Sequence, residues 1–172
     1  MKLLENFSDK EINYSLFGNL LGDAYLRSYK NTAWLENSHT NKQKDYVLFL
    51  NEVYKVWKLD TKLILDKTRT NDYGTYSYSS CNVRVKDKRH FDFNRAYDNN
   101  NIKIVSDYVL NRITPFGLLL WYLDDGSLTV HSKPNNSFSR QATISTNSFT
   151  YEEHLKIQKM FKQRFDIDVK IH

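Results

Sequence analysis

Two apolar helical patterns that end in acidic residues constrain this chain more than any other feature. The apolar run ends at a Gly-Asp pair in NLLGDAYLRS, residues 19–28. It ends at Asp-Asp-Gly in LLLWYLDDGSL, residues 118–128. The carboxyl end of a helix carries partial negative charge and prefers a cation to a carboxylate. A chain that places acids at two such positions needs a compensating positive charge there.

Each of the two helices also has a clear start signal. Ser8 and Glu11 form a capping box, which predicts a first helix that runs to about residue 22. Thr114 followed by Pro115 is an N-cap with proline at the first helical position. The second helix is apolar on nearly every side, which is typical of a helix in the centre of a fold.

The segments around the two helices repeat. Gly18 and Gly22 share one face of the first helix and would let a partner helix approach closely, and we expect the second helix to be that partner. Two strands and a helix follow each of the two acid-ending helices. After the first come strands at 24–29 and 32–38 and a helix from Thr40. After the second come strands at 127–131 and 140–146 and a helix that begins at the capping box of Thr150 and Glu153. This order indicates an internal duplication.

We therefore predict an α+β fold with residues 1–98 as the first unit, 99–113 as a connecting segment and 114–172 as the second unit. The final segment, IDVKIH at 167–172, is expected to be the third strand of the second unit. That unit would then lack its last strand and helices. An unpaired apolar strand edge invites pairing with another chain.

A polar hairpin is predicted in the first unit, with strands at 63–70 and 75–86. Side chains alternate between the two faces of a strand, so the even-numbered positions of 76–86 share one polar and cationic face. Such a β-ribbon can read base edges in the major groove of DNA. The alternative interpretation is an ordinary solvated strand face.

Composition limits the remaining possibilities. A chain of 172 residues with 40% hydrophobic residues can build a packed core, and a net charge of +5 favours nucleic acid only weakly. The lone Cys81 excludes an internal disulfide, no apolar run reaches the length of about 18 residues that spans a membrane, and no signal peptide is visible. We expect a soluble intracellular protein of an organelle matrix or of a bacterial or phage cytoplasm.

Asp23 and Asp125 would come together if the duplicated helices pack side by side. Divalent cations relieve the repulsion between carboxylates, and hard oxygen ligands suit Mg²⁺. Such a site predicts hydrolysis of a phosphodiester. Taken one at a time, an Asp beside Gly at a helix end is more often a turn residue.

These residues resemble a known family. FGNLLGDAYL, LLLWYLDDGSL and TNSFTYEE are similar to the signature segments of LAGLIDADG homing endonucleases of the single-chain, two-motif kind. The resemblance implies two pseudo-symmetric αββαββα units, the second one truncated here, with saddle-shaped sheets on duplex DNA. It also implies a monomeric intron- or intein-type endonuclease that cuts both strands of a long asymmetric site across the minor groove and leaves short 3′ overhangs. Mg²⁺ is the implied cofactor, with Mn²⁺ as a substitute, and group I intron RNA stays open as a partner.

The resemblance also assigns roles to individual residues. Asp23, Asp125 and Lys103 are the implied catalytic residues, and the backbone carbonyls of Gly22 and Asp124 are implied to join the two aspartates at the metal. Polar groups that close the second strands could orient solvent or could simply cap those strands. They are Ser38 or His39 in the first unit and Thr146 or Asn147 in the second. The expected DNA-binding residues are Arg27, Lys67, Arg69, Tyr76, Tyr78, Asn82, Arg84, Lys86, Lys133 and Arg140.

Two other functions stay open. A protein of this fold that binds nucleic acid but no longer cuts it, such as an RNA-splicing maturase or a DNA-binding regulator, would have a very similar sequence. A small metal-dependent hydrolase of soluble metabolites would share the acids but leaves the polar hairpin face unexplained.

Overall fold

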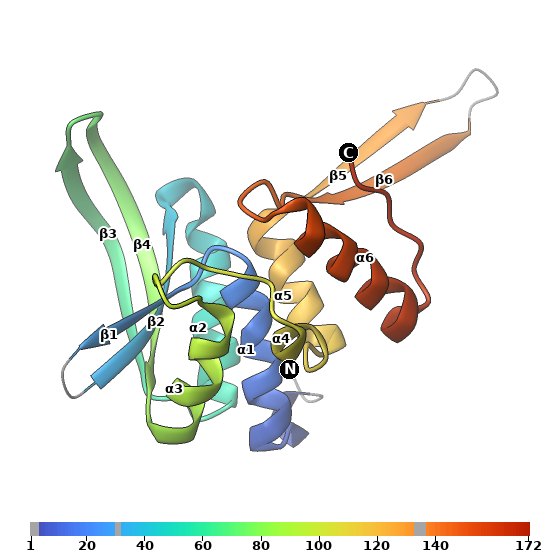
Figure 1. Ribbon diagram of the computed structural model, residues 1–172. Coiled ribbons are helices and arrows are strands. Elements are labelled where there is room, and N and C mark those ends of the chain that lie inside the picture. Colours follow the sequence, from blue (N-terminus) through green and yellow to red (C-terminus); the bar gives the residue numbers. More distant parts are fainter. Residues whose placement is uncertain (1–3, 30–31, 133–136) are drawn as a thin grey trace. The chain divides into compact units, whose positions relative to one another are not determined.

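The computed structural model describes residues 4–29, 32–132 and 137–172, which hold six α-helices and six β-strands (Figure 1). The predicted α+β fold is confirmed. The chain divides into two compact units, Met1–Asn13 with Asp23–Asn94 and Tyr14–Gly22 with Arg95–His172. Helix α1 (Asp9–Leu21) therefore contributes to both units. The sequence-based division into a first repeat at 1–98, a connecting segment at 99–113 and a second repeat at 114–172 stays a prediction.

The first unit is a four-stranded antiparallel sheet with helices, in the order αββαββα (Figure 1). After α1 come β1 (Tyr25–Tyr29), β2 (Thr32–Thr40), α2 (Lys44–Val56), β3 (Thr61–Asn71), β4 (Gly74–Val85) and α3 (Asp87–Phe93). The strands lie in the order β1-β2-β4-β3. The predicted capping box holds α1, because the Ser8 backbone N–H donates to Glu11 Oε2 at 2.8 Å.

Helix α2 covers one face of this sheet. Its Val47, Leu50 and Val53 are completely buried, and its Asn51 lies against Cys81 of β4. Residues Leu35 and Val83, which are cross-strand partners, belong to the same buried face. Burial raises the pKa of Cys81 to about 12, so this thiol is an unreactive core residue.

The second unit holds a two-stranded sheet, the hairpin β5–β6 (Figure 1). Its elements are α4 (Asp107–Leu110), α5 (Pro115–Asp125), β5 (Gly126–Ser132), β6 (Phe138–Ile144) and α6 (Tyr151–Phe165). The predicted caps are confirmed, since Thr114 Oγ1 accepts from the Gly117 N–H at 2.9 Å and Thr150 forms a capping box with Glu153.

Helix α5 and the end of α1 pack with their backbones in contact inside the second unit. A Cβ atom added to Gly18 would lie 1.8 Å from the Gly117 carbonyl oxygen, which is shorter than any real contact. The Ser15 and Thr114 hydroxyls are 2.7 Å apart at the start of this contact. The prediction that the two signature helices are partners is therefore confirmed.

Two details of the second unit differ from the sequence-based expectation. Residues 167–172 are described without a strand, so the prediction of a third strand there is wrong. A strand requires a hydrogen-bonded neighbour, whereas here Asp166 takes a left-handed conformation after α6 and Gln158 Nε2 donates to the Val169 carbonyl. Helix α5 is also not buried on every side, since Leu119 is 42% exposed.

No helix within residues 4–29, 32–132 and 137–172 combines the length and the apolar character that a membrane span requires.

Candidate metal centre and nucleic-acid interface

Asp23 directly follows α1 and faces a histidine of the first unit. Asp23 Oδ2 lies 3.5 Å from Nδ1 of His39, whose side chain is almost completely buried, while the Asp23 side chain is 44% exposed. Burial lowers the pKa of His39, and the Asp23 carboxylate and a hydrogen bond to Gln43 offset part of this shift. The Asp23 carboxylate therefore has one oxygen, Oδ2, next to the His39 ring and is still accessible to solvent.

The acids at the end of α5 have different surroundings within the second unit. Asp124 Oδ2 accepts a hydrogen bond from Asn19 Nδ2 at 3.2 Å and lies so close to Gly22 that a Cβ atom there would be 2.5 Å away. The Asp125 carbonyl instead accepts from the Ser145 N–H at 2.9 Å. Asp125 also lines a cavity of about 1150 Å³ between α5, the β5–β6 hairpin and α6.

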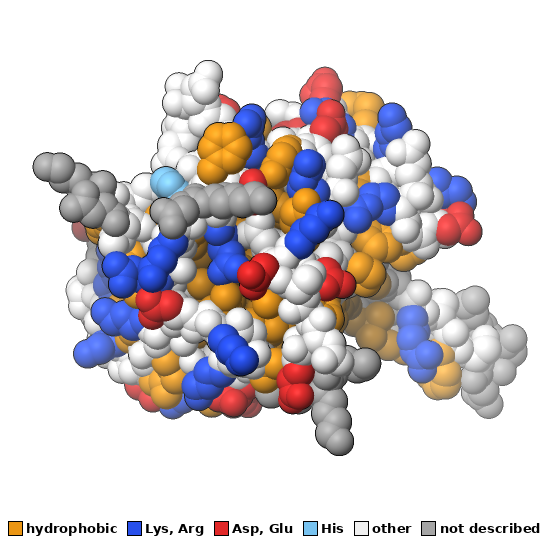
Figure 2. All heavy atoms as spheres, turned by 90° about the horizontal axis from the view of Figure 1, so that it is seen from below, with side chains coloured by type: hydrophobic (Ala, Val, Ile, Leu, Met, Phe, Trp, Pro, Cys, Tyr) orange, Lys and Arg blue, Asp and Glu red, His pale blue; other side chains and the backbone are white. Residues whose placement is uncertain are grey.

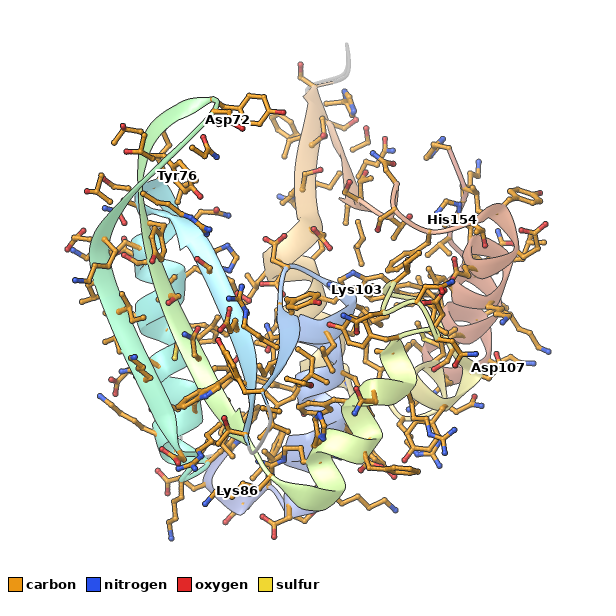
Figure 3. The ribbon with its side chains drawn as sticks, turned by 60° about the vertical axis from the view of Figure 1, so that its left-hand side comes forward. Asp72, Tyr76, Lys86, Lys103, Asp107 and His154 are labelled. Carbon is orange, nitrogen blue, oxygen red and sulfur yellow. The ribbon has the colours of Figure 1, made fainter. Side chains whose placement is uncertain are left out.

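Lys103, which the resemblance implies to be catalytic, reaches the end of α1 within the second unit. Its Nζ donates to the Gly22 carbonyl oxygen at 2.6 Å (Figure 3). The backbone at Lys103 is fixed by a β-bridge to Tyr97. A positive charge therefore offsets the negative end of this helix, which is the compensation that the sequence required. The structure brings Lys103, Gly22 and Asp124 together, while the approach of Asp23 to Asp125 stays a prediction.

Seven of the expected DNA-binding residues lie on one face of the four-stranded sheet, opposite the face that α2 covers. In this register Arg27 and Arg84 both flank Trp34, Lys67 pairs with Tyr78, and Arg69 pairs with Tyr76. We call this surface the polar sheet face; its predicted residues are Arg27, Lys67, Arg69, Tyr76, Tyr78, Asn82 and Arg84. Figure 3 shows Tyr76 near the tip of the β3–β4 hairpin and Lys86 beyond the other end of β4. The predicted division of β4 into two faces is confirmed.

Two acids on the polar sheet face were not found from the sequence. Glu36 Oε2 lies 3.2 Å from Arg27 Nε, and Asp60 Oδ2 lies 3.8 Å from an Arg84 guanidinium nitrogen. A hydrogen bond to Tyr29 and the Glu36 carboxylate raise the pKa of Arg27. The Glu36 contact holds the Arg27 side chain on the sheet, whereas the longer Asp60 contact with Arg84 lies at the exposed surface. The pairing of distant strands creates these contacts, so no local sequence pattern could have predicted them.

The β5–β6 hairpin has a polar face of its own. Ser127 pairs with Thr143, Thr129 with Gln141, and His131 with Ser139. Their alternation in GSLTVHS was visible in the sequence and was missed. Arg140 pairs with Val130 and so lies on the opposite, apolar face, and Lys133 lies outside the described residues.

The basic side chains on the face of the molecule seen in Figure 2 are dispersed. On the face shown in Figure 2, Lys and Arg lie scattered among acidic and apolar side chains. This distribution agrees with the modest net charge of +5. The ordered arrangement on the polar sheet face is therefore more informative than the total charge.

The sequence matches the LAGLIDADG DNA endonuclease family over residues 14–172. The chain therefore belongs to this family, and the resemblance inferred from its two signature helices is confirmed. Nucleases of the family depend on a metal ion.

Individual relatives agree with this assignment. DNA endonuclease I-ChuI of Chlamydomonas applanata is 30% identical over 162 residues, which cover 89% of this chain and 72% of I-ChuI. Cytochrome b mRNA maturase bI2 of Debaryomyces hansenii is 24% identical over 174 residues, covering 95% of this chain and 60% of the maturase. The fold is similar to that of the homing endonuclease I-WcaI bound to its DNA recognition sequence, with a TM-score of 0.67, 23% identity, and coverage of 95% of this chain and 71% of I-WcaI. This last likeness establishes the fold.

Proposed function

We propose that this chain is a site-specific DNA endonuclease that hydrolyses one phosphodiester in each strand of its target. The observation that carries the proposal is the pair of signature helices in backbone contact. Lys103 donates to the Gly22 carbonyl, the Asp124 side chain packs on Gly22, and Asp23 is the next residue. Family membership supports the reaction class. The polar sheet face supplies a surface suited to duplex DNA.

The donor groups at these helix ends fit a divalent cation. Carboxylates and a backbone carbonyl are hard oxygen ligands of the kind that Mg²⁺ prefers, and Mn²⁺ accepts the same set. The Gly22 carbonyl accepts from the Lys103 ammonium group, and this contact supports the proposal that positive charge gathers at this helix end. We propose Asp23 and Asp125 as the carboxylate ligands and the carbonyls of Gly22 and Asp124 as further ligands. When bound, the metal would polarise the phosphate and make water a better nucleophile.

The chain's own residues have distinct roles in this proposal. Asp23 follows Gly22 directly, so consecutive Cα atoms about 3.8 Å apart keep its carboxylate near the carbonyl that Lys103 binds. Lys103 donates to an oxygen and can stabilise negative charge that develops on a phosphate. The polar sheet face and Lys86 would hold the duplex, with duplex DNA at a long asymmetric site as the partner and the protein as a monomer. The lone Cys81 agrees with a reducing compartment inside a cell.

The proposal is tested by selecting a target from a pool of randomised duplex DNA in Ca²⁺ and then adding Mg²⁺. We expect linearisation of a plasmid that carries the selected site, and no cutting in EDTA. Selective binding without cutting in Mg²⁺ or Mn²⁺ would contradict the proposed activity.

The similarity to a maturase supports a second function, which is binding of intron RNA without DNA cleavage. The same preparation distinguishes the two functions. A chain that binds a group I intron RNA and promotes its splicing, but leaves every selected DNA intact, would be a maturase.

Alanine substitutions of Arg84 and Lys86 should change DNA affinity and not the cleavage rate at saturating protein. If Lys86 contacts a phosphate, its loss should weaken binding to all DNA sequences alike. It should also lower the slope of log K against log salt concentration by about one unit. If Arg84 reads a guanine, its loss should cost about 1–3 kcal/mol and relax specificity at one position. Fluorescence anisotropy at several salt concentrations measures both effects.

Folding should hardly change in either variant, because Arg84 is paired with Asp60 only at the surface, where ion pairs contribute little. A large fall in melting temperature with unaltered DNA binding would show that the face has been assigned wrongly. Thr68→Ala, on the other face of the same hairpin, is the matched control.

A further inference from the structure

The β3–β4 hairpin contains one extra residue in β3, about halfway along the strand. The pairing of β3 with β4 is regular up to Ile64 and resumes at Lys67 after a register shift. Leu65 and Asp66 therefore lie together opposite Ser79, which is the arrangement of a β-bulge. Bulges change the direction of a strand and are common beside functional sites.

The extra residue decides on which face of the sheet Lys67 and Arg69 lie. Side chains alternate along a strand, and directly opposite partners share a face. Lys67 pairs with Tyr78 and Arg69 with Tyr76, so both cations belong to the polar sheet face. In an unbroken ladder continued from Ile64, the register would differ by one residue, and both cations would lie on the opposite face.

Asp66 has the backbone conformation of an irregular strand position. Its φ is 53°, which lies in the left-handed region. Asp and Asn adopt this region more readily than other residues with a side chain, whereas β-branched residues strongly disfavour it. Such a conformation persists only where the surroundings hold it.

Polar contacts within the first unit hold Asp66 in place. Its Oδ1 accepts from Asn41 Nδ2 at 3.0 Å, and its Oδ2 accepts from Lys44 Nζ at 2.5 Å. The Asp66 N–H donates to the hydroxyl of the completely buried Ser79 at 3.2 Å, and that hydroxyl donates to Asn41 Oδ1 at 2.9 Å. The Asp66–Lys44 ion pair is partly exposed, where such pairs contribute little to stability. These contacts therefore orient the bulge more than they stabilise the fold.

We propose that Asp66 is a positioning residue for DNA recognition. Its anchored carboxylate holds the bulge in β3, and the bulge places Lys67 and Arg69 on the polar sheet face. The inference rests on the proposed function, because it concerns how the chain recognises DNA. A carboxylate in a DNA-binding hairpin would repel phosphates if it faced the duplex, but here Lys44 offsets its charge.

The first measurement is the register of the hairpin in the full chain without DNA. Nuclear Overhauser contacts across the ladder show whether Arg69 lies opposite Tyr76, as in the bulged register, or opposite Thr75. We expect the bulged register in the unmodified chain and in Asp66→Asn, since Asn accepts the left-handed conformation. We expect the unbroken register in Asp66→Val, because a β-branched residue disfavours that conformation.

The second measurement is the affinity for the selected target in Ca²⁺. Asp66→Val should lower this affinity by about tenfold or more, the size expected when the contacts of an arginine are lost. Arg69→Ala should lower affinity in the otherwise unmodified chain and have hardly any further effect in Asp66→Val. A merely structural role of Asp66 would leave the effect of Arg69→Ala unchanged, so this double-mutant cycle isolates the positioning role.

Thr68→Val is the matched control, because it introduces the same side chain two residues away, where the pairing is regular. It should keep both the register and the affinity. Asp66→Gly covers the case in which Asp66→Val does not fold, since glycine accepts the left-handed conformation but lacks the anchored carboxylate. It should keep the bulged register and bind DNA more weakly than the unmodified chain. Thermal melting reports the folding of each variant.

The bulged register with full DNA affinity in folded Asp66→Val would overturn the inference, as would unchanged affinity in Asp66→Gly. If the chain cuts its target but Arg69→Ala has the same effect with and without Asp66→Val, only this inference fails. If the chain binds its target through Arg69 in the predicted way but does not cut it, the proposed nuclease activity fails instead.

Discussion

Replacement of Asp23 or Asp125 by Asn should lower double-strand cleavage by about 10²–10³-fold or more, while DNA binding in Ca²⁺ is retained. Asn keeps the size of the side chain and removes the charge that we propose holds the metal, and loss of one such electrostatic group has effects of this size. Stability should stay the same or rise slightly, because an acid at the carboxyl end of a helix is unfavourable. Single-turnover cleavage, anisotropy binding and thermal melting measure the three effects.

Asp124→Asn is the control inside the same motif. The Asp124 side chain accepts from Asn19 and packs on Gly22, and only its backbone carbonyl is assigned to the metal. This variant should therefore keep most of the cleavage activity. Full activity in Asp125→Asn together with complete loss in Asp124→Asn would show that the motif has been aligned one residue out of register.

The second large effect is expected on folding, from Gly18→Ala. The new Cβ atom would lie 1.8 Å from the Gly117 carbonyl oxygen, a backbone atom that cannot move without its helix. Overpacking of this kind costs about 1–3 kcal/mol or more, which exceeds the gain of about 1 kcal/mol from replacing glycine by alanine in a helix. The free energy of unfolding from urea titration measures the difference.

Gly117→Ala is the matched control, since the same change on the partner helix brings Cβ to 3.0 Å from the Ser15 carbonyl oxygen. A small shift of the neighbours can accommodate that distance, so the loss of stability should be clearly smaller than in Gly18→Ala. Equal stability of both variants and the unmodified chain would contradict the close packing of α1 and α5.

The sequence was sufficient for features with a local chemical signal. The caps at Ser8, Thr114 and Thr150 place three helix starts correctly. Alternation in β4 predicts the burial of Cys81, Val83 and Val85, but Ser80 of the predicted polar face is buried as well. The pairing of the signature helices followed from the glycine at position 18. Each of these signals depends on neighbouring residues whose spacing is fixed by helix or strand geometry.

Features that depend on distant segments were not predictable in the same way. The ion pairs of Arg27 and Arg84 exist only because β1, β2, β4 and β3 lie in a particular register. Arg140 was expected on a DNA-binding surface because of its charge, but its pairing with Val130 places it on the apolar face. The strand predicted at 167–172 failed because β-propensity alone cannot supply a pairing partner.

The DNA ends that the full chain produces from its selected target in Mg²⁺ test the proposed nuclease most directly when they are sequenced. We expect one cut in each strand at fixed positions, with a short 3′ overhang, and no ends when either Asp23 or Asp125 is replaced by Asn. An intact duplex, or ends that the two variants still produce, would rule out the proposed site.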